Sequence, residues 1–295
     1  MKNKSAGLTQ RGKADEKIMK AVFMVSAAVS VMAVAAICFF LFYTGIPAIR
    51  EIGIFKFLGG TLWKPLEGQF GIFPMIVGSI YVTAGAIIIG VPLGVLCAVF
   101  LAKYCGPGLY KIFKPAVNLL AGIPSIVYGF FGLMVIVPVM QRIFGTGGKG
   151  ILTASIMLGI MILPTIISVS EAAIRAVPGT YYEGSLALGA THERSVFAAC
   201  LPAAKSGIMA SIILGIGRAL GETMAVVMVA GNQAVLPNSL LAGVRTMTAN
   251  IVMEMGYASE GLHRNALIAT AVVLFVFILI INLLFSLTGG RSKNE

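Results

Sequence analysis

The chain has 295 residues, of which 58% are hydrophobic and only 11% are charged, and its mean hydropathy is +0.95. Soluble domains carry about 25% charged residues, so this composition excludes a soluble globular protein. The net charge of +11 does not indicate nucleic-acid binding, because the basic residues lie between apolar runs and form no patch interleaved with aromatic side chains. The chain is therefore predicted to be an all-α integral membrane protein.

Six apolar runs are each long enough to cross a bilayer, which takes about 20 helical residues. They cover residues 19–43, 73–101, 117–140, 151–170, 207–230 and 266–287. An even number of spans puts both ends of the chain on one side. With the N-terminal tail inside, roughly two-thirds of the 22 basic residues fall on the cytoplasmic side, and this bias predicts that both termini are cytoplasmic.

The same runs divide the chain into segments. These are a cytoplasmic tail at 1–18, a first helix at 19–43, an extracytoplasmic segment at 44–70, a transmembrane domain at 71–288 and a cytoplasmic tail at 289–295. The first helix is thus appended to a core of five. A cleaved signal peptide ending near Ala35 is the alternative, but its apolar region would hold only about 7 to 15 residues. This run continues to Tyr43, so we expect the first helix to be retained.

Cysteine and histidine usage gives no sign of a disulfide framework or a metal site. The four cysteines include no Cys-x-x-Cys pair. His192 and His263 fall on opposite predicted sides of the membrane, so they are not expected to share a metal ion.

Two charged residues, Arg218 and Glu222, lie four positions apart inside an otherwise uncharged apolar run. A charged side chain at mid-bilayer costs roughly 2.5 to 3.5 kcal/mol, so such residues usually face a bundle interior or a solute path. On a helix these positions share a face, and Glu222 is expected to neutralise Arg218. We predict that both line a substrate pathway. A structural salt bridge that only pins two helices is the alternative.

Glycine and proline recur inside the spans, where neighbouring helices or a cavity must satisfy the freed backbone groups. A role in helix packing or gating is therefore expected for Gly122, Pro124, Ser125, Gly129, Gly217 and Gly221. For any single one of them, plain packing of small residues is an equally good interpretation.

The longest inside loop, residues 171–205, carries helix start and stop signals. Thr180 and Glu183 fit a capping box, which predicts a helix start there. Gly189 supplies a left-handed stop, and Thr191 is placed to cap a second short helix. Pro202 predicts a further break. The loop is thus predicted to form two short helices at a bend.

Residues 183–202 resemble the Glu-Ala-Ala signature loop of ABC importer permeases. Glu183, Gly189, Leu201 and Pro202 stand at the family spacing, whereas Gly184 and Ser185 replace the paired alanines and Ala199 stands where isoleucine is usual. The resemblance implies a type I (MetI-like) permease core of five helices, and a loop that seats in a groove of an ATPase subunit. It assigns that contact to Glu183, Gly184, Leu186, Ala187, Gly189, Ala190, Leu201 and Pro202.

Residues 121–129, 171–178 and 217–232 are similar to the phosphate-specific branch of these permeases, and the last stretch resembles the PstC subunit more than PstA. The resemblance implies a permease subunit of an ATP-driven phosphate importer in the bacterial inner membrane. The implied partners are a PstA-like second permease, a PstB-like ATPase dimer and an extracytoplasmic PstS-like phosphate-binding protein.

The chain is not expected to bind ATP or to be catalytic. Its nearest approach to a Walker A loop, residues 143–150, has Ile143 in place of the first glycine and Gly150 in place of the hydroxyl residue. ATP and Mg²⁺ would therefore be bound by the partner ATPase, with no cofactor in this chain. A permease for sulfate or molybdate and an ion-driven secondary transporter or channel are the alternative functions. An intramembrane enzyme would need a polar constellation that the sequence lacks.

Overall fold

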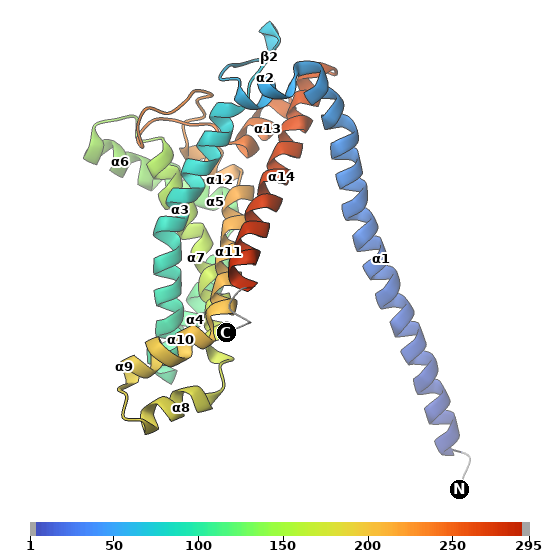
Figure 1. Ribbon diagram of the computed structural model, residues 1–295, viewed down its shortest axis with the longest axis vertical. Helices are drawn as coiled ribbons and strands as arrows, with labels where there is room; N and C mark the ends of the chain where they lie inside the picture. Colours follow the sequence, from blue (N-terminus) through green and yellow to red (C-terminus); the bar gives the residue numbers. More distant parts are fainter. Residues whose placement is uncertain (1–3, 291–295) are drawn as a thin grey trace.

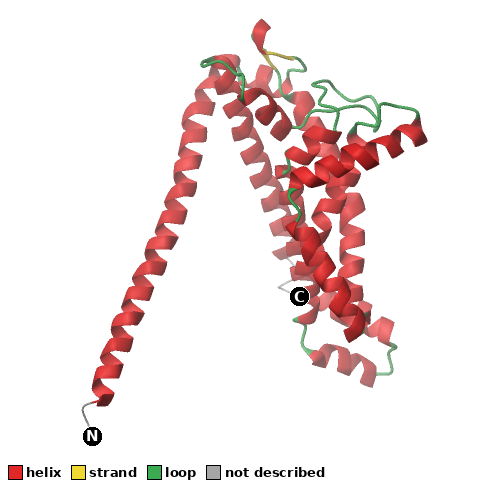
Figure 2. Ribbon diagram, turned by 180° about the vertical axis from the view of Figure 1, so that it is seen from behind, coloured by secondary structure: helices red, strands yellow, loops and turns green. Residues whose placement is uncertain are grey.

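The structure, a computed structural model, describes residues 4–290, and the side chains of residues 16–284. Within this range, five helices are long and apolar enough to cross a membrane, or up to six if a bent pair formed by residues 192–203 and 205–221 is one span. The helices run between two ends of the molecule, and the only strands among the described residues form one short hairpin (Figures 1 and 2). The predicted all-α membrane fold is confirmed.

Helix α1 (Lys4–Ile52) is longer at both ends than the predicted 19–43. Part of the predicted tail 1–18 and the start of the predicted segment 44–70 are therefore helical, and the helix passes through Pro47. Residues 16–37 are all exposed. In Figure 1, α1 leaves the bundle and meets α14 (Leu262–Gly290) only near its upper end, where the rings of Phe42 and Phe275 pack edge to face at 5.9 Å.

The rest of the predicted extracytoplasmic segment forms a small folded cap. It consists of α2 (Ile54–Gly59), β1 (Trp63–Lys64), η1 (Pro65–Glu67) and β2 (Gln69–Phe70), with β1 and β2 antiparallel. The Trp63 indole Nε1 donates to Glu254 Oε2 at 2.7 Å, which ties the cap to α13 (Met247–Met255). An apolar cluster of α1, α3, α13 and α14 side chains lies beneath it.

The centre of the bundle is the pair α3 (Phe73–Val99) and α7 (Ile151–Arg175). A Cβ atom at Gly90 would stand 2.8 Å from Ile162 Cδ1, so this glycine lets the two helices approach closely. Pro92 and Pro164 lie inside these helices without ending them. The main apolar core gathers between α3, α5, α7 and α12.

The predicted span at 117–140 is wrong, because the chain breaks within it. A separate helix, α4 (Pro107–Gly122), precedes a span made of α5 (Ser125–Phe131), η3 (Gly132–Ile136) and α6 (Val137–Phe144). Ile123 is extended, with φ −69° and ψ 127°. The ring of Pro124 disfavours helical geometry at the residue before it, and this ends α4.

The predicted span at 207–230 is also divided, into α11 (Lys205–Gly221) and α12 (Met224–Val229). Before it come α8 (Gly179–Ala187), α9 (His192–Ser195), η4 (Val196–Cys200) and α10 (Leu201–Ala203), with a bend of 69° between residues 192–203 and α11. Helix α14 ends at Gly290, so residues 291–295 of the predicted tail 289–295 lie outside the described part.

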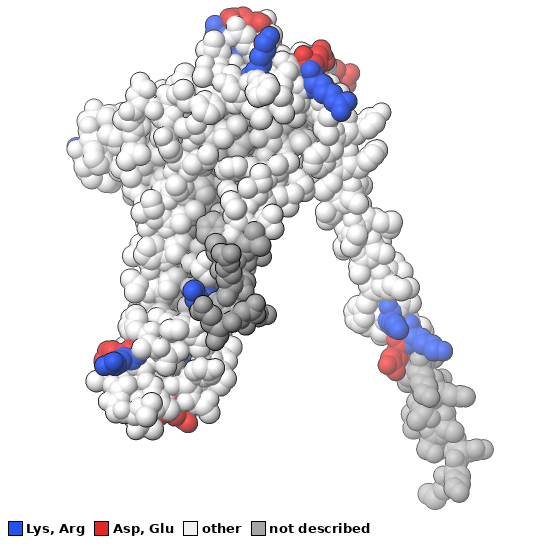
Figure 3. Space-filling model, viewed as in Figure 1, with Lys and Arg blue, Asp and Glu red and all other residues white. Residues whose placement is uncertain are grey.

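Helix α1 begins and α14 ends toward the end of the molecule that carries α8 (Figure 1). Charged side chains gather at this end and at the end that carries α2, and the broad band between is almost free of them (Figure 3). This distribution is that of a bilayer-spanning protein with two polar ends.

Candidate translocation site and coupling loop

Arg218 lies in the last turn of α11 and is half-buried against α7. Its Nη1 donates to the Thr165 hydroxyl at 3.3 Å, the one hydrogen bond of this side chain within the described residues. The guanidinium thus lies between two helices of the bundle, as expected for a charge at membrane depth. Four of its five N–H donors have no protein acceptor in the described structure.

The predicted ion pair between Arg218 and Glu222 is wrong: no such pair occurs within the described part of the chain. Helix α11 ends at Gly221, and Glu222 is extended, with φ −69° and ψ 131°. The two residues therefore do not share a helix face. Instead, Glu222 Oε1 accepts from the amides of Thr223 at 3.1 Å and Ala225 at 3.3 Å. The carboxylate satisfies amides at the start of α12, where the helix dipole favours a negative charge.

The break at Glu222 is also held by α13. Thr248, on α13, donates its hydroxyl to the Glu222 carbonyl at 3.2 Å. Thr246 caps α13 by accepting from the Ala249 amide at 3.2 Å. The α11–α12 break is therefore an ordered turn whose freed backbone groups have partners, as a membrane interior requires.

The glycines expected to serve packing or gating divide into two groups. A Cβ atom at Gly129 would stand 2.8 Å from both Ala225 Cα and Met228 Sδ, so Gly129 allows α5 to contact α12. At Gly122, Gly217 and Gly221 a Cβ atom would meet nothing within 4 Å. Pro124 and Ser125 form the start of α5.

The predicted coupling loop, residues 171–205, starts later in the structure, because α7 continues to Arg175. Residues 176–204, called the coupling loop from here on, form short helices as predicted, but not with the predicted first cap. Helix α8 starts at Gly179, and Pro178 rather than Thr180 stands at its N-cap with no side-chain bond, so the capping box is wrong. The left-handed stop at Gly189 is confirmed by its φ of +83°. Thr191 caps α9 by accepting from the Arg194 amide at 3.3 Å.

The end of this loop differs from the prediction, because the bend does not fall at Pro202. Pro202 lies inside the continuous helix of residues 192–203, directly after the π-helical turn η4, and the chain turns two residues later at Ala204.

The residues predicted to contact an ATPase lie on an accessible surface. Leu186 is 40% exposed and the adjoining Leu188 is 92% exposed. The predicted contact residues Glu183, Gly184, Ala187, Gly189 and Pro202 are exposed, and Ala190 and Leu201 are partly buried. An exposed leucine at a polar end of the protein is available for a protein contact.

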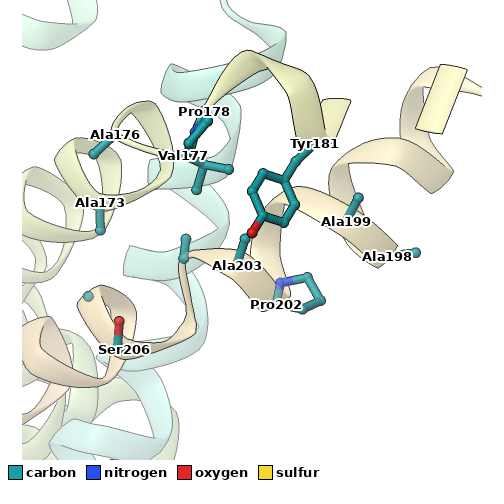
Figure 4. A pocket seen from close by; sticks show the side chains of 12 residues that line it. Ala173, Ala176, Val177, Pro178, Tyr181, Ala198, Ala199, Pro202, Ala203 and Ser206 are labelled. Atoms are coloured by element: carbon teal, nitrogen blue, oxygen red, sulfur yellow. The ribbon is translucent and has the colours of Figure 1, made fainter. Parts of the chain in front are cut away.

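A cavity of about 720 Å³ lies behind the loop, between the end of α7, the start of α8 and the α10–α11 bend. Small residues line most of it, among them Ala173, Ala199 and Ala203. The Tyr181 hydroxyl points across the opening toward Ala203 (Figure 4). The loop is therefore separated from the bundle by open space on this side.

Two buried carboxylates were not identified from the sequence. Each one holds together the segments at one end of the bundle. Glu171 is 2% exposed and bonds Lys114 and Arg175, while Glu254 is 5% exposed and bonds Arg245 and Trp63. The four-residue spacing of Glu171 and Arg175 on one helix was a usable signal. The partners of Glu254 come from distant segments, and no local pattern predicts them.

No set of three acidic, histidine or cysteine side chains in the described residues could hold a metal ion.

Comparison with known proteins identifies the family that this chain matches. Residues 90–292 match the family described as binding-protein-dependent transport system inner membrane component. The probable ABC transporter permease protein YqgH of Bacillus subtilis (strain 168) is 37% identical over 290 residues, covering 96% of this chain and 94% of that protein. The phosphate transport system permease protein PstC of Mesorhizobium japonicum is 37% identical over 247 residues, covering 77% and 76%.

Solved structures support the fold. One, of the MetNI methionine ABC transporter in inward-facing conformations, aligns with a TM-score of 0.52 and 22% identity over 78% of this chain and 97% of that one. Another, of a bacterial ABC transporter that imports alginate, aligns with a TM-score of 0.57 and 17% identity over 93% and 98%. At these identities the likeness shows the fold alone, and it confirms the predicted MetI-like permease core.

Proposed function

The chain belongs to the family of binding-protein-dependent transport system inner membrane components, and we propose that it is the PstC-type permease subunit of an ATP-driven phosphate importer. The observation that carries this proposal is that proteins named phosphate transport system permease protein PstC are 36–37% identical to it over about three-quarters of the chain. The half-buried arginine fits the same function, because the substrate is an anion.

We propose that Arg218 contacts the anion in transit. A guanidinium is planar and offers parallel donors that suit two oxygens of a tetrahedral oxyanion. Thr165 uses only one of these donors. Because Glu222 is bonded to amides at the start of α12, it does not neutralise Arg218, and an arriving anion would supply the missing counter-charge. Glu222 would stabilise the α11–α12 break beside the pathway. Its negative charge would repel the transported anion and so favour release of the anion.

The pathway would form against a second, PstA-like permease. The open space beside Gly122, Gly217 and Gly221 gives α4 and α11 faces that no part of the described chain covers. Closure of a PstB-like ATPase dimer would act on the coupling loop through the exposed Leu186 and Leu188. ATP and Mg²⁺ would be bound there, and a PstS-like protein would deliver phosphate from outside.

The proposal is tested by reconstituting the permease pair, the ATPase and the binding protein in liposomes. Radiolabelled phosphate should accumulate only with ATP, and sulfate and molybdate should not. Arginine alone does not distinguish these anions, so exchange of the binding protein for a sulfate-specific one tests where selectivity lies. Phosphate uptake driven by an ion gradient without ATP would instead support a secondary transporter, and the proposal would be abandoned.

A further inference from the structure

We propose that Glu171 is a positioning residue for transport, and that its buried cluster passes movement of the coupling loop to α4 and the break at 122–124. This inference rests on the proposed function. It concerns how ATP hydrolysis is connected to transport, and not which solute is carried.

The cluster joins three segments at the end of the bundle that carries α8. Glu171, on α7, accepts from Lys114 Nζ at 2.7 Å, Arg175 Nε at 2.8 Å and the Tyr110 hydroxyl at 2.8 Å. Lys114 and Tyr110 lie on α4, and the Arg175 guanidinium stacks on the Tyr110 ring at 4.5 Å. Arg175 Nη2 also donates to the Leu101 carbonyl at 2.7 Å, which adds η2 (Phe100–Tyr104), the helical segment that follows α3. Both carboxylate oxygens thus have charged donors.

The cluster is connected directly to the coupling loop. Arg175 is the last residue of α7, and α8 starts four residues later at Gly179. The segment η2, which Arg175 holds through Leu101, also contacts the loop on its other side. There the Tyr104 ring meets the His192 ring at 4.8 Å, and Lys103 lies 5.6 Å from the centre of the Tyr182 ring.

On its other side the cluster is connected to the proposed pathway through α4. Val117, the one buried residue that α4 contributes among those described, packs against Ile167 of α7, and Glu171 adds the polar contacts that hold α4 to α7. At the far end of α4, the Tyr128 hydroxyl of α5 donates to the Leu120 carbonyl at 2.8 Å. Helix α4 is therefore fastened at one end to α7 and at the other to α5, across the extended Ile123.

A buried ion cluster is weak support for stability, because desolvation of the charges offsets much of their attraction. What it provides is a fixed geometry, since each bond demands its own direction. With the cluster intact, α7, η2 and α4 must move together when the loop moves. With it broken, the loop would shift against the bundle while α4 stays behind.

The test uses Glu171→Gln in the complete reconstituted transporter, with phosphate moved per ATP hydrolysed as the readout. Glutamine keeps the size but cannot pair with two cations. We expect the binding protein to continue to stimulate ATP hydrolysis while the transport ratio falls about tenfold, a size typical of coupling between sites. Lys114→Met, which removes one partner only, should lower the ratio less and protects the test if Glu171→Gln fails to assemble.

Glu254→Gln is the matched control, because Glu254 is also buried and paired with an arginine but lies at the opposite end of the bundle. It should lower the thermal unfolding midpoint of the complex without changing the transport ratio. An unchanged ratio in both Glu171→Gln and Lys114→Met would overturn the inference. Wild-type complexes that move no phosphate would instead refute the proposed function, so the two failures are distinguishable.

Discussion

Glu222 illustrates how one residue changes role when the helix around it ends. The sequence places it one turn beyond Arg218, and an unbroken helix would pair the two. The structure ends α11 at Gly221, and the carboxylate turns to the amides of Thr223 and Ala225. Charge at membrane depth was thus predictable from the sequence, whereas the partner was not, because a single extended residue redirects the side chain.

This role makes a prediction for Glu222→Ala. Loss of an acceptor at a helix start costs about 1 kcal/mol, so the variant should lower the thermal unfolding midpoint of the purified permease pair. Glu222→Gln retains a side-chain oxygen and should keep most of that stability. If glutamine proves as destabilising as alanine, the negative charge and not the cap is what matters, and an ion pair with Arg218 would have to be reconsidered.

At the scale of elements, the close contact of α5 with α12 depends on Gly129. A methyl group there would overlap Ala225 and Met228, and overpacking of this kind costs about 1–3 kcal/mol. Gly129→Ala should therefore lower the unfolding midpoint of the permease pair measured by thermal denaturation.

Gly217→Ala serves as its control, because a Cβ atom at Gly217 meets nothing within 4 Å and alanine favours the helix. The control should be neutral or slightly stabilising, because the face beside Gly217 is proposed to border the open pathway between the two permeases. Equal destabilisation by both changes would mean that Gly217 is covered in the assembled complex.

The exposed end of α8 makes a second prediction. Burial of a leucine contributes about 1.5–3 kcal/mol, and Leu188 is available for such a contact. Leu188→Glu should strongly reduce the amount of ATPase subunit that co-purifies with the permease pair. Leu66→Glu changes an equally exposed leucine at the opposite end and should leave co-purification unchanged. Full retention of the ATPase by Leu188→Glu would remove α8 from the predicted contact.

Helices were predicted well from the sequence where apolar periodicity is uninterrupted. They were predicted poorly where the conformation of one or two residues determines whether a helix continues or ends. The spans at 73–101 and 151–170 closely match α3 and α7. Pro124 ends one predicted span and Pro164 does not end another. The difference lies in tertiary contacts, because α7 is the most buried span and its neighbours hold the helix through the proline. Such contacts are not visible in a local pattern.

At the scale of the whole molecule, the proposed partners require the predicted membrane orientation. The ATPase must meet the coupling loop inside the cell, and the binding protein must meet the opposite end outside. The bias of basic residues places the start of α1 and the coupling loop inside, and the β1–β2 cap outside. In a variant without its native cysteines, Glu67→Cys should react with a membrane-impermeant maleimide on intact cells. Glu16→Cys should react only after permeabilisation. The opposite pattern would invert the topology and place the coupling loop out of reach of a cytoplasmic ATPase.

The proposed mechanism requires that Arg218 contacts the transported anion inside the membrane. The most direct measurement is ATP-dependent phosphate uptake by liposomes that contain the complete transporter with Arg218→Gln, beside Thr165→Val as a control that removes only its protein partner. We predict that the Arg218 variant assembles with its ATPase but loses phosphate uptake, while the Thr165 variant retains most of it. Uptake at the wild-type rate by Arg218→Gln would contradict the proposed role of this residue.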